Sequence, residues 1–149
     1  MQRALLLILL AAAGWAGAAY GTWKLNPARS TFGGDTQPRS FTIRIAPHSK
    51  GEVLTLDRIE ADGRATSSST LLYLDGTKRV FRDIECSGTQ SSRRIDSQTV
   101  EILRSCGGVW TRLVRRIAPS KQLVLEISEQ RAGHRFDRRL VFDKNKEKK

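Results

Sequence analysis

The 149-residue chain is long enough for one domain, and its 39% hydrophobic content allows a modest core but excludes a bundle of membrane-spanning helices. It carries 26 Lys and Arg against 15 Asp and Glu, a net charge of +11, so the protein is strongly basic. Gly, Ser and Thr are frequent, and Val, Ile and Leu recur at strand spacing, which excludes both a helical bundle and a disordered chain.

Residues 1–19 have the pattern of a secretory signal. Arg3 gives a positive N-region, residues 4–13 are apolar, and the small residues at 16–18 form a cleavage site before Ala19. We therefore expect residues 1–18 to be removed as a signal peptide and the protein to be periplasmic or secreted. The alternative is an uncleaved anchor, because residues 4–20 contain no charge.

The predicted mature chain consists of one β domain over residues 19–142 and a charged tail over residues 143–149. Residues 1–18 hold a single charged side chain, Arg3, so the mature net charge is one less than that of the full chain, +10. For an exported protein, this charge favours partners such as anionic lipid, envelope polymer or acidic small molecules. We expect a monomer with no cofactor and no nucleic-acid partner.

Two cysteines, Cys86 and Cys106, remain in the mature chain and lie 20 positions apart. An even number of cysteines in an oxidising compartment predicts a disulfide, which adds about 3 kcal/mol for a loop of this length. Two separate buried thiols are the alternative. A metal site is not predicted, because there is no Cys-x-x-Cys pair and His48 and His134 stand alone.

The remaining chain alternates short apolar-polar runs with turn residues. Phe41, Ile43 and Ile45 share one face of such a run, which is the period of a half-buried strand. Asp75-Gly76 between two extended runs predicts a hairpin. The pattern predicts ten strands, over residues 21–25, 40–46, 52–60, 65–74, 77–82, 92–95, 99–104, 109–117, 122–128 and 134–142.

The short connections leave no room for crossover helices, so the strands are expected to pair in an antiparallel manner. The predicted fold class is all-β: a small antiparallel up-and-down β-barrel or half-open clam of about ten strands. A closed barrel would remove exposed strand edges, and a two-sheet sandwich is the alternative.

The run Gly21-Thr22-Trp23-Lys24-Leu25 resembles the first strand of the calycins, the lipocalins and fatty-acid-binding proteins. Three later runs resemble the closing strands of fatty-acid-binding proteins, and a longer pattern is similar to small secreted bacterial proteins of unassigned function. The runs begin at Trp110, Leu123 and Leu140, and the longer pattern covers residues 22–30, 94–96 and 99–101. The resemblance implies a ten-stranded barrel that binds a small ligand.

The resemblance also implies a structural role for Trp23, which closes one end of a calycin barrel beneath an arginine from the end of the chain. Arg138 or Arg139 would take that place here. Two features depart from fatty-acid-binding proteins. Residues 26–39 are too rich in Gly and Pro for a helical lid, and Leu140 and Phe142 replace the arginine and tyrosine of the carboxylate clamp.

Three arginines, Arg104, Arg115 and Arg138, alternate with apolar residues on predicted strands. If the apolar faces point inward, these arginines also point inward or lie at a rim, where a guanidinium binds a carboxylate or phosphate. The alternative is that a bulge turns them outward or that they extend to solvent at a barrel mouth. Because few acidic residues share their faces, they are the predicted ligand-binding residues.

No nucleophile elbow, phosphate loop or zinc-protease motif is present, so no catalytic residues are predicted and the protein is not expected to be an enzyme. Two functions remain. The first is an exported barrel that binds a small anionic amphiphile. The second is an envelope interaction protein without a cavity, which binds anionic lipid or polymer through its basic surface.

Overall fold

The structure, a computed structural model, describes residues 17–82 and 86–146, so most of the predicted signal peptide and the last three residues of the charged tail lie outside the described residues. Two short 3-10 helices, η1 (Gly17–Ala19) and η2 (Pro27–Arg29), flank the first strand. Ten strands follow the order of the prediction: β1 (Gly21–Leu25), β2 (Ser40–His48), β3 (Gly51–Ile59), β4 (Ala65–Leu72), β5 (Arg79–Arg82), β6 (Ser87–Asp96), β7 (Thr99–Cys106), β8 (Val109–Ile117), β9 (Leu123–Arg131) and β10 (His134–Lys144).

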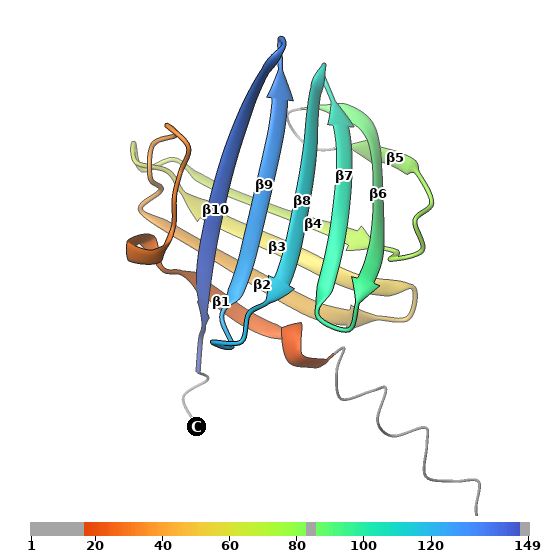
Figure 1. Cartoon of the computed structure of the whole chain (residues 1–149), viewed down its shortest axis with the longest axis horizontal. Helices are drawn as coiled ribbons and strands as arrows, with labels where there is room; N and C mark the ends of the chain where they lie inside the picture. The colour runs from red at the N-terminus through yellow and green to blue at the C-terminus, as the bar shows by residue number, and fades with distance from the viewer. Residues whose placement is uncertain (1–16, 83–85, 147–149) are drawn as a thin grey trace, which may run out of the picture.

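All ten strands form one antiparallel sheet in the order β4-β3-β2-β1-β10-β9-β8-β7-β6-β5. The sheet curls into a half-open barrel in which β1–β4 cross behind β6–β10 (Figure 1). The short strand β1 joins the two layers, because it pairs with β2 on one side and with β10 on the other. The all-β prediction is confirmed in its half-open form, and the single continuous sheet rules out a two-sheet sandwich.

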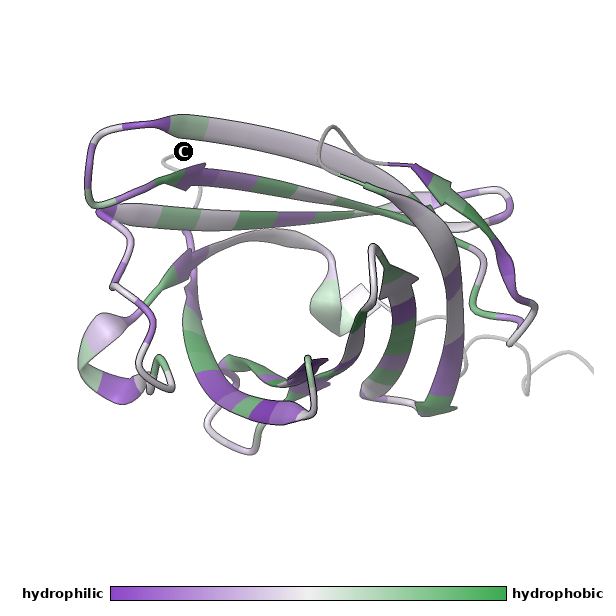
Figure 2. Ribbon diagram, turned by 90° about the horizontal axis from the view of Figure 1, so that it is seen from above, coloured by the Kyte–Doolittle hydropathy of each residue, from purple (hydrophilic) through white to green (hydrophobic). Residues whose placement is uncertain are grey.

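Alternation along the strands decides which side chains face the interior, and apolar and polar residues alternate visibly along the ribbons (Figure 2). The register keeps the inward residues of neighbouring strands in rows, such as Leu25 opposite Phe142 and Leu140 opposite Leu125. The rings of Phe41 and Phe142 lie 5.3 Å apart and join the two layers. The core is therefore densest where β1, β2 and β10 meet.

The predicted hairpin at Asp75-Gly76 is wrong. Strands β4 and β5 lie at opposite ends of the sheet order and do not pair with each other. Asp75 does organise a local turn, because its carboxylate accepts hydrogen bonds from the Thr77 N–H and from both terminal nitrogens of Arg79. The connection then runs to β6: Asp75 forms an isolated bridge with Arg93, and the Gly76 N–H donates to the Ser92 carbonyl at 2.8 Å.

Strand β6 is longer than predicted, since the segment from Ser87 to Ser91 is strand rather than polar loop. Its small residues allow close pairing with β7. A Cβ atom on Gly88 would lie 1.8 Å from the Ser105 carbonyl oxygen, so glycine is required at this crossing. The predicted disulfide is confirmed: Cys86, just before β6, is bonded to Cys106 at the end of β7, with the two Cα atoms 5.8 Å apart.

Candidate functional site

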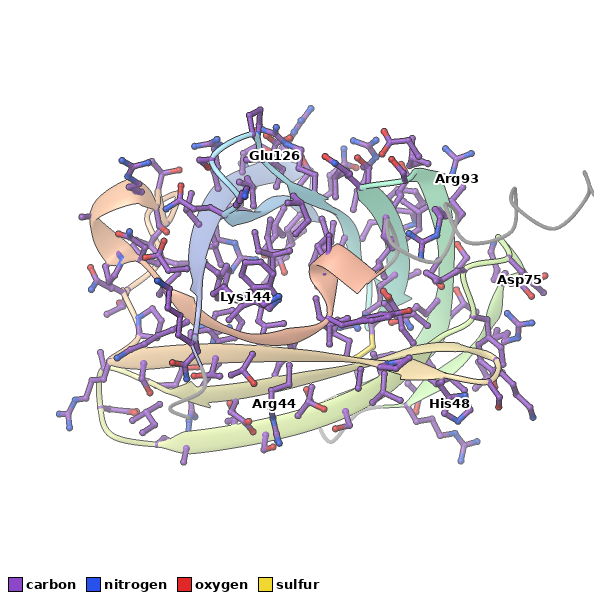
Figure 3. The ribbon with its side chains drawn as sticks, turned by 90° about the horizontal axis from the view of Figure 1, so that it is seen from below. Arg44, His48, Asp75, Arg93, Glu126 and Lys144 are labelled. Carbon is purple, nitrogen blue, oxygen red and sulfur yellow. A yellow bond between two sulfur atoms is a disulfide. The ribbon has the colours of Figure 1, made fainter. Side chains whose placement is uncertain are left out.

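The interior is filled at the end of the half-barrel that contains Trp23. Its indole is buried, and its Nε1 donates a hydrogen bond to the Ala19 carbonyl at 2.8 Å. Neither Arg138 nor Arg139 lies over this ring. The neighbouring cation is Lys144, whose Nζ lies 5.5 Å from the ring centroid because β10 pairs with β1 at Trp23 (Figure 3). Trp23 therefore belongs to the buried core at this end of the half-barrel.

A cleft of about 440 Å³ opens between the two edge strands, β4 and β5. It is lined by Leu54 and Leu56 of β3, residues 67–70 of β4, Phe81 and Arg82 of β5, and Arg104 of β7. Its volume is in the range of small-molecule sites. Among the described residues that line it, two carry a positive charge and none carries a negative charge. This cleft is the candidate functional site.

Arg104 is held in a defined position on the wall of the cleft. Its Nε and one terminal nitrogen donate to the Gln90 side-chain oxygen at 3.0 and 2.8 Å, and its guanidinium carbon lies 4.0 Å above the centroid of the Phe81 ring. Gln90 in turn donates to the Thr70 hydroxyl at 3.4 Å, which links β6 to β4. Arg104 is thus the predicted arginine that the fold brings to the cleft.

Arg115 lies deeper and is almost completely buried. Its terminal nitrogen is 2.5 Å from a carboxylate oxygen of Glu52, and the two side chains are only 4% and 1% exposed. The second carboxylate oxygen of Glu52 has no hydrogen-bond partner among the described residues. We expected few acidic residues on the inner faces and did not identify Glu52 as one of them. Glu52 alternates with Leu54 and Leu56 on β3, and this alternation indicates that it faces inward.

Arg138 faces inward, away from the residues that line the cleft. Its guanidinium contacts Asp35 at 2.8 Å and Glu129 at 3.8 Å, so two acidic groups of the protein already compensate its charge. Arg139 lies opposite Glu126 in the register of β10 and β9, and its Nε is 3.9 Å from the Glu126 carboxylate. Glu126 lies on the outer face of the sheet (Figure 3). The three predicted arginines therefore lie in three different environments, and one of them lines the cleft.

The outer face of the β6–β10 layer carries paired charges. Glu101 is buried between Arg93 and Arg112, whose nitrogens lie 2.9 and 2.8 Å from its two oxygens. Burial by itself would raise the pKa of Glu101, but the hydrogen bonds from both arginines outweigh it, so the pKa lies below its ordinary value. This cluster of ion pairs links β6, β7 and β8 to one another and does not form a binding site.

No three His, Cys, Asp or Glu side chains in residues 17–82 and 86–146 are placed to hold a metal ion. In the same part of the chain, no helix has the length and apolar character needed to cross a membrane.

Comparison with known proteins gives a fold but no sequence family: no protein-family model and no curated protein matches the chain. Among solved structures, a fatty-acid-binding protein from Schistosoma mansoni in complex with arachidonic acid has a TM-score of 0.57 at 9% identity, covering 89% of this chain and all of the other. The zebrafish ileal bile-acid-binding protein complexed with cholic acid gives 0.57 at 9% identity, over 86% of this chain and 99% of its own.

The fluorescent protein UnaG gives a TM-score of 0.56 at 13% identity, over 85% of this chain and 96% of that one. These likenesses extend over almost the whole described chain and concern the fold. The protein therefore has a calycin-like fold, a ten-stranded antiparallel half-barrel.

Proposed function

We propose that the protein is an exported, non-enzymatic carrier that holds a small anionic amphiphile in the cleft between β4 and β5. The observation that carries the proposal is Arg104, fixed by Gln90 and Phe81 on the wall of a cleft whose other residues include Leu54 and Leu56. A positioned guanidinium beside apolar side chains matches a ligand with an acidic head and an aliphatic body.

Two further observations support the proposal. Two of the similar structures hold an acidic lipid, arachidonic acid in one and cholic acid in the other. The Cys86–Cys106 disulfide supports an oxidising compartment, as does the signal-peptide pattern of residues 1–18.

The N-terminal sequence of the protein exported from its own host should begin at Ala19. A product that begins at Met1 would contradict cleavage of the signal peptide.

Calorimetric titration with dodecanoate and with the neutral dodecanol tests the proposal. Arg104→Met keeps much of the side-chain volume and removes the charge, so it should weaken dodecanoate binding by about 10- to 150-fold, the range for a hydrogen bond to a charged group. Dodecanol binding should change much less. Arg138→Met is the matched control, because Arg138 is not among the residues that line the cleft. Equal effects of the two substitutions would contradict the proposal.

A second candidate, attachment to an anionic lipid surface, is favoured by the exposed aromatic side chain of Trp110 on β8. The register places Arg135 in the same cross-strand row as Trp110, and aromatic and basic residues together suit a membrane interface. Co-sedimentation with phosphatidylglycerol vesicles tests it. Binding that falls with salt and is lost in Trp110→Ser would support it, and no binding would exclude it.

A further inference from the structure

Strand β4 ends the sheet with a free and unprotected edge. It pairs with β3 only, and none of the strands in the described residues uses the hydrogen-bonding groups of its other edge. Residues 65–69 are exposed, and the whole strand Ala65–Leu72 contains no charged residue and no proline. Edge strands are ordinarily protected by such residues because free backbone N–H and C=O groups attract another extended segment.

The cleft runs along this edge rather than over one face of the strand. Ser67 and Ser69 belong to one face of β4, and Ser68 and Thr70 to the other, yet all four line the same cleft. The hydroxyls of Ser67 and Ser69 are already bonded to Asp57 and Thr55 of β3, at 2.6 and 2.8 Å. The backbone edge of β4, together with the hydroxyls of Ser68 and Thr70, is therefore the polar surface that this wall offers to a ligand.

The rest of the cleft offers two other kinds of contact. Leu54 and Leu56 provide an apolar surface on β3, and Phe81 adds an aromatic ring from β5. Arg82 of β5 and Arg104 of β7 add two positively charged residues from the other end of the sheet order. A ligand that fills the cleft thus meets an apolar wall, a cationic wall and a row of strand amides.

We infer that the ligand is an anionic amphiphile with an amide group next to its carboxylate, that is, an N-acyl amino acid or a short acylated peptide. This inference rests on the proposed carrier function and names the class of its ligand. The amide extends the sheet by pairing with the β4 edge, the acyl chain packs on Leu54 and Leu56, and the carboxylate pairs with Arg104 or Arg82. A plain fatty acid would cover the same edge and leave its backbone groups without partners, which costs affinity.

Three ligands test the inference by calorimetric titration of the mature protein, each below its critical micelle concentration. N-dodecanoylglycine carries the amide, O-dodecanoylglycolate replaces the N–H by an ester oxygen, and pentadecanoate is a fatty acid of the same chain length. N-dodecanoylglycine should bind about tenfold more tightly than either of the other two ligands. This factor corresponds to the hydrogen bond that its amide gains with the β4 edge, where the backbone groups then have partners. In Arg104→Met all three should weaken by a similar factor, because the carboxylate is common to them.

Amide hydrogen exchange measured by NMR tests the inference independently. N-dodecanoylglycine should slow exchange at β4 residues whose N–H groups face the cleft more than pentadecanoate does, because only its amide carbonyl can accept a hydrogen bond from them. Equal affinity for the amide and ester ligands, without β4 protection, would overturn the inference and leave the carrier function standing. If none of the three ligands binds, the carrier function itself is overturned.

Discussion

The stability that a buried charged residue provides depends on its partner, as the Arg115–Glu52 pair shows. Both side chains are nearly inaccessible, and they come from strands on different layers of the half-barrel. Removing two charges from water is costly, and mutual attraction offsets this cost only while both are present. Arg115→Met or Glu52→Met alone should therefore lower the free energy of unfolding by about 3–5 kcal/mol, measured by urea denaturation.

The double variant Glu52→Met/Arg115→Met is the control for this pair. It removes both charges and retains apolar volume, so it should recover most of the stability lost by either single variant. A double-mutant cycle quantifies the recovery. Single variants that lose less than about 1 kcal/mol would show that solvent reaches the pair.

Glu101 provides a pH-dependent contribution to stability on the outer face. Its pKa in the folded protein lies below the ordinary 4.5, so the unfolded state binds more protons as the pH falls. The stabilisation is fully present above pH 4.5 and is lost as the pH falls through the lower folded-state pKa. Glu101→Gln should accordingly destabilise the protein at pH 7, and the difference from the wild type should shrink under acidic conditions.

Glu126→Gln is the matched control for Glu101→Gln. Glu126 is half exposed and contacts Arg116 and Arg139 at 3.2 and 3.9 Å, so its loss should have a small effect at any pH. Urea unfolding at a series of pH values compares the two variants. A constant difference between Glu101→Gln and the wild type down to acidic pH would contradict the role of the ionised carboxylate.

At the scale of elements, the disulfide connects the beginning of β6 to the end of β7, next to the short edge strand β5. The variant Cys86→Ser/Cys106→Ser should lower the free energy of unfolding by about 3 kcal/mol, because the unfolded chain regains the freedom of the closed loop. Adding a dithiol reductant to the wild type should give the same loss and should leave the variant unchanged. A reductant effect of equal size on both would point to a cause other than this bond.

At the scale of the whole molecule, the net charge of +11 for the full chain, or +10 without residues 1–18, should accelerate the capture of an anionic ligand. Raising the ionic strength from about 0.01 to 0.15 M shortens the Debye length from about 30 to 8 Å, so association with dodecanoate should slow markedly. Stopped-flow fluorescence measures the association rate. Dodecanol serves as the uncharged comparison, and an equal salt effect on both ligands would exclude electrostatic steering.

Local patterns in the sequence are sufficient to predict the strands and their faces. The alternation of Phe41, Ile43 and Ile45 depends only on the strand period, and all three are buried. The disulfide was predictable from an even number of cysteines in a chain with the pattern of a secretory signal. The fold class was predictable for the same reason, because ten short runs with short connections allow only antiparallel pairing.

The tertiary structure alone decided which strands face one another across the interior. An alternating pattern gives the face of a strand but does not give its partner on the opposite layer, so Glu52 could not be matched with Arg115. The Asp75-Gly76 turn has the local geometry of a turn, yet its strands separate because the connection pairs with β6. The cleft lies between these separated strands, and Arg104 lines it.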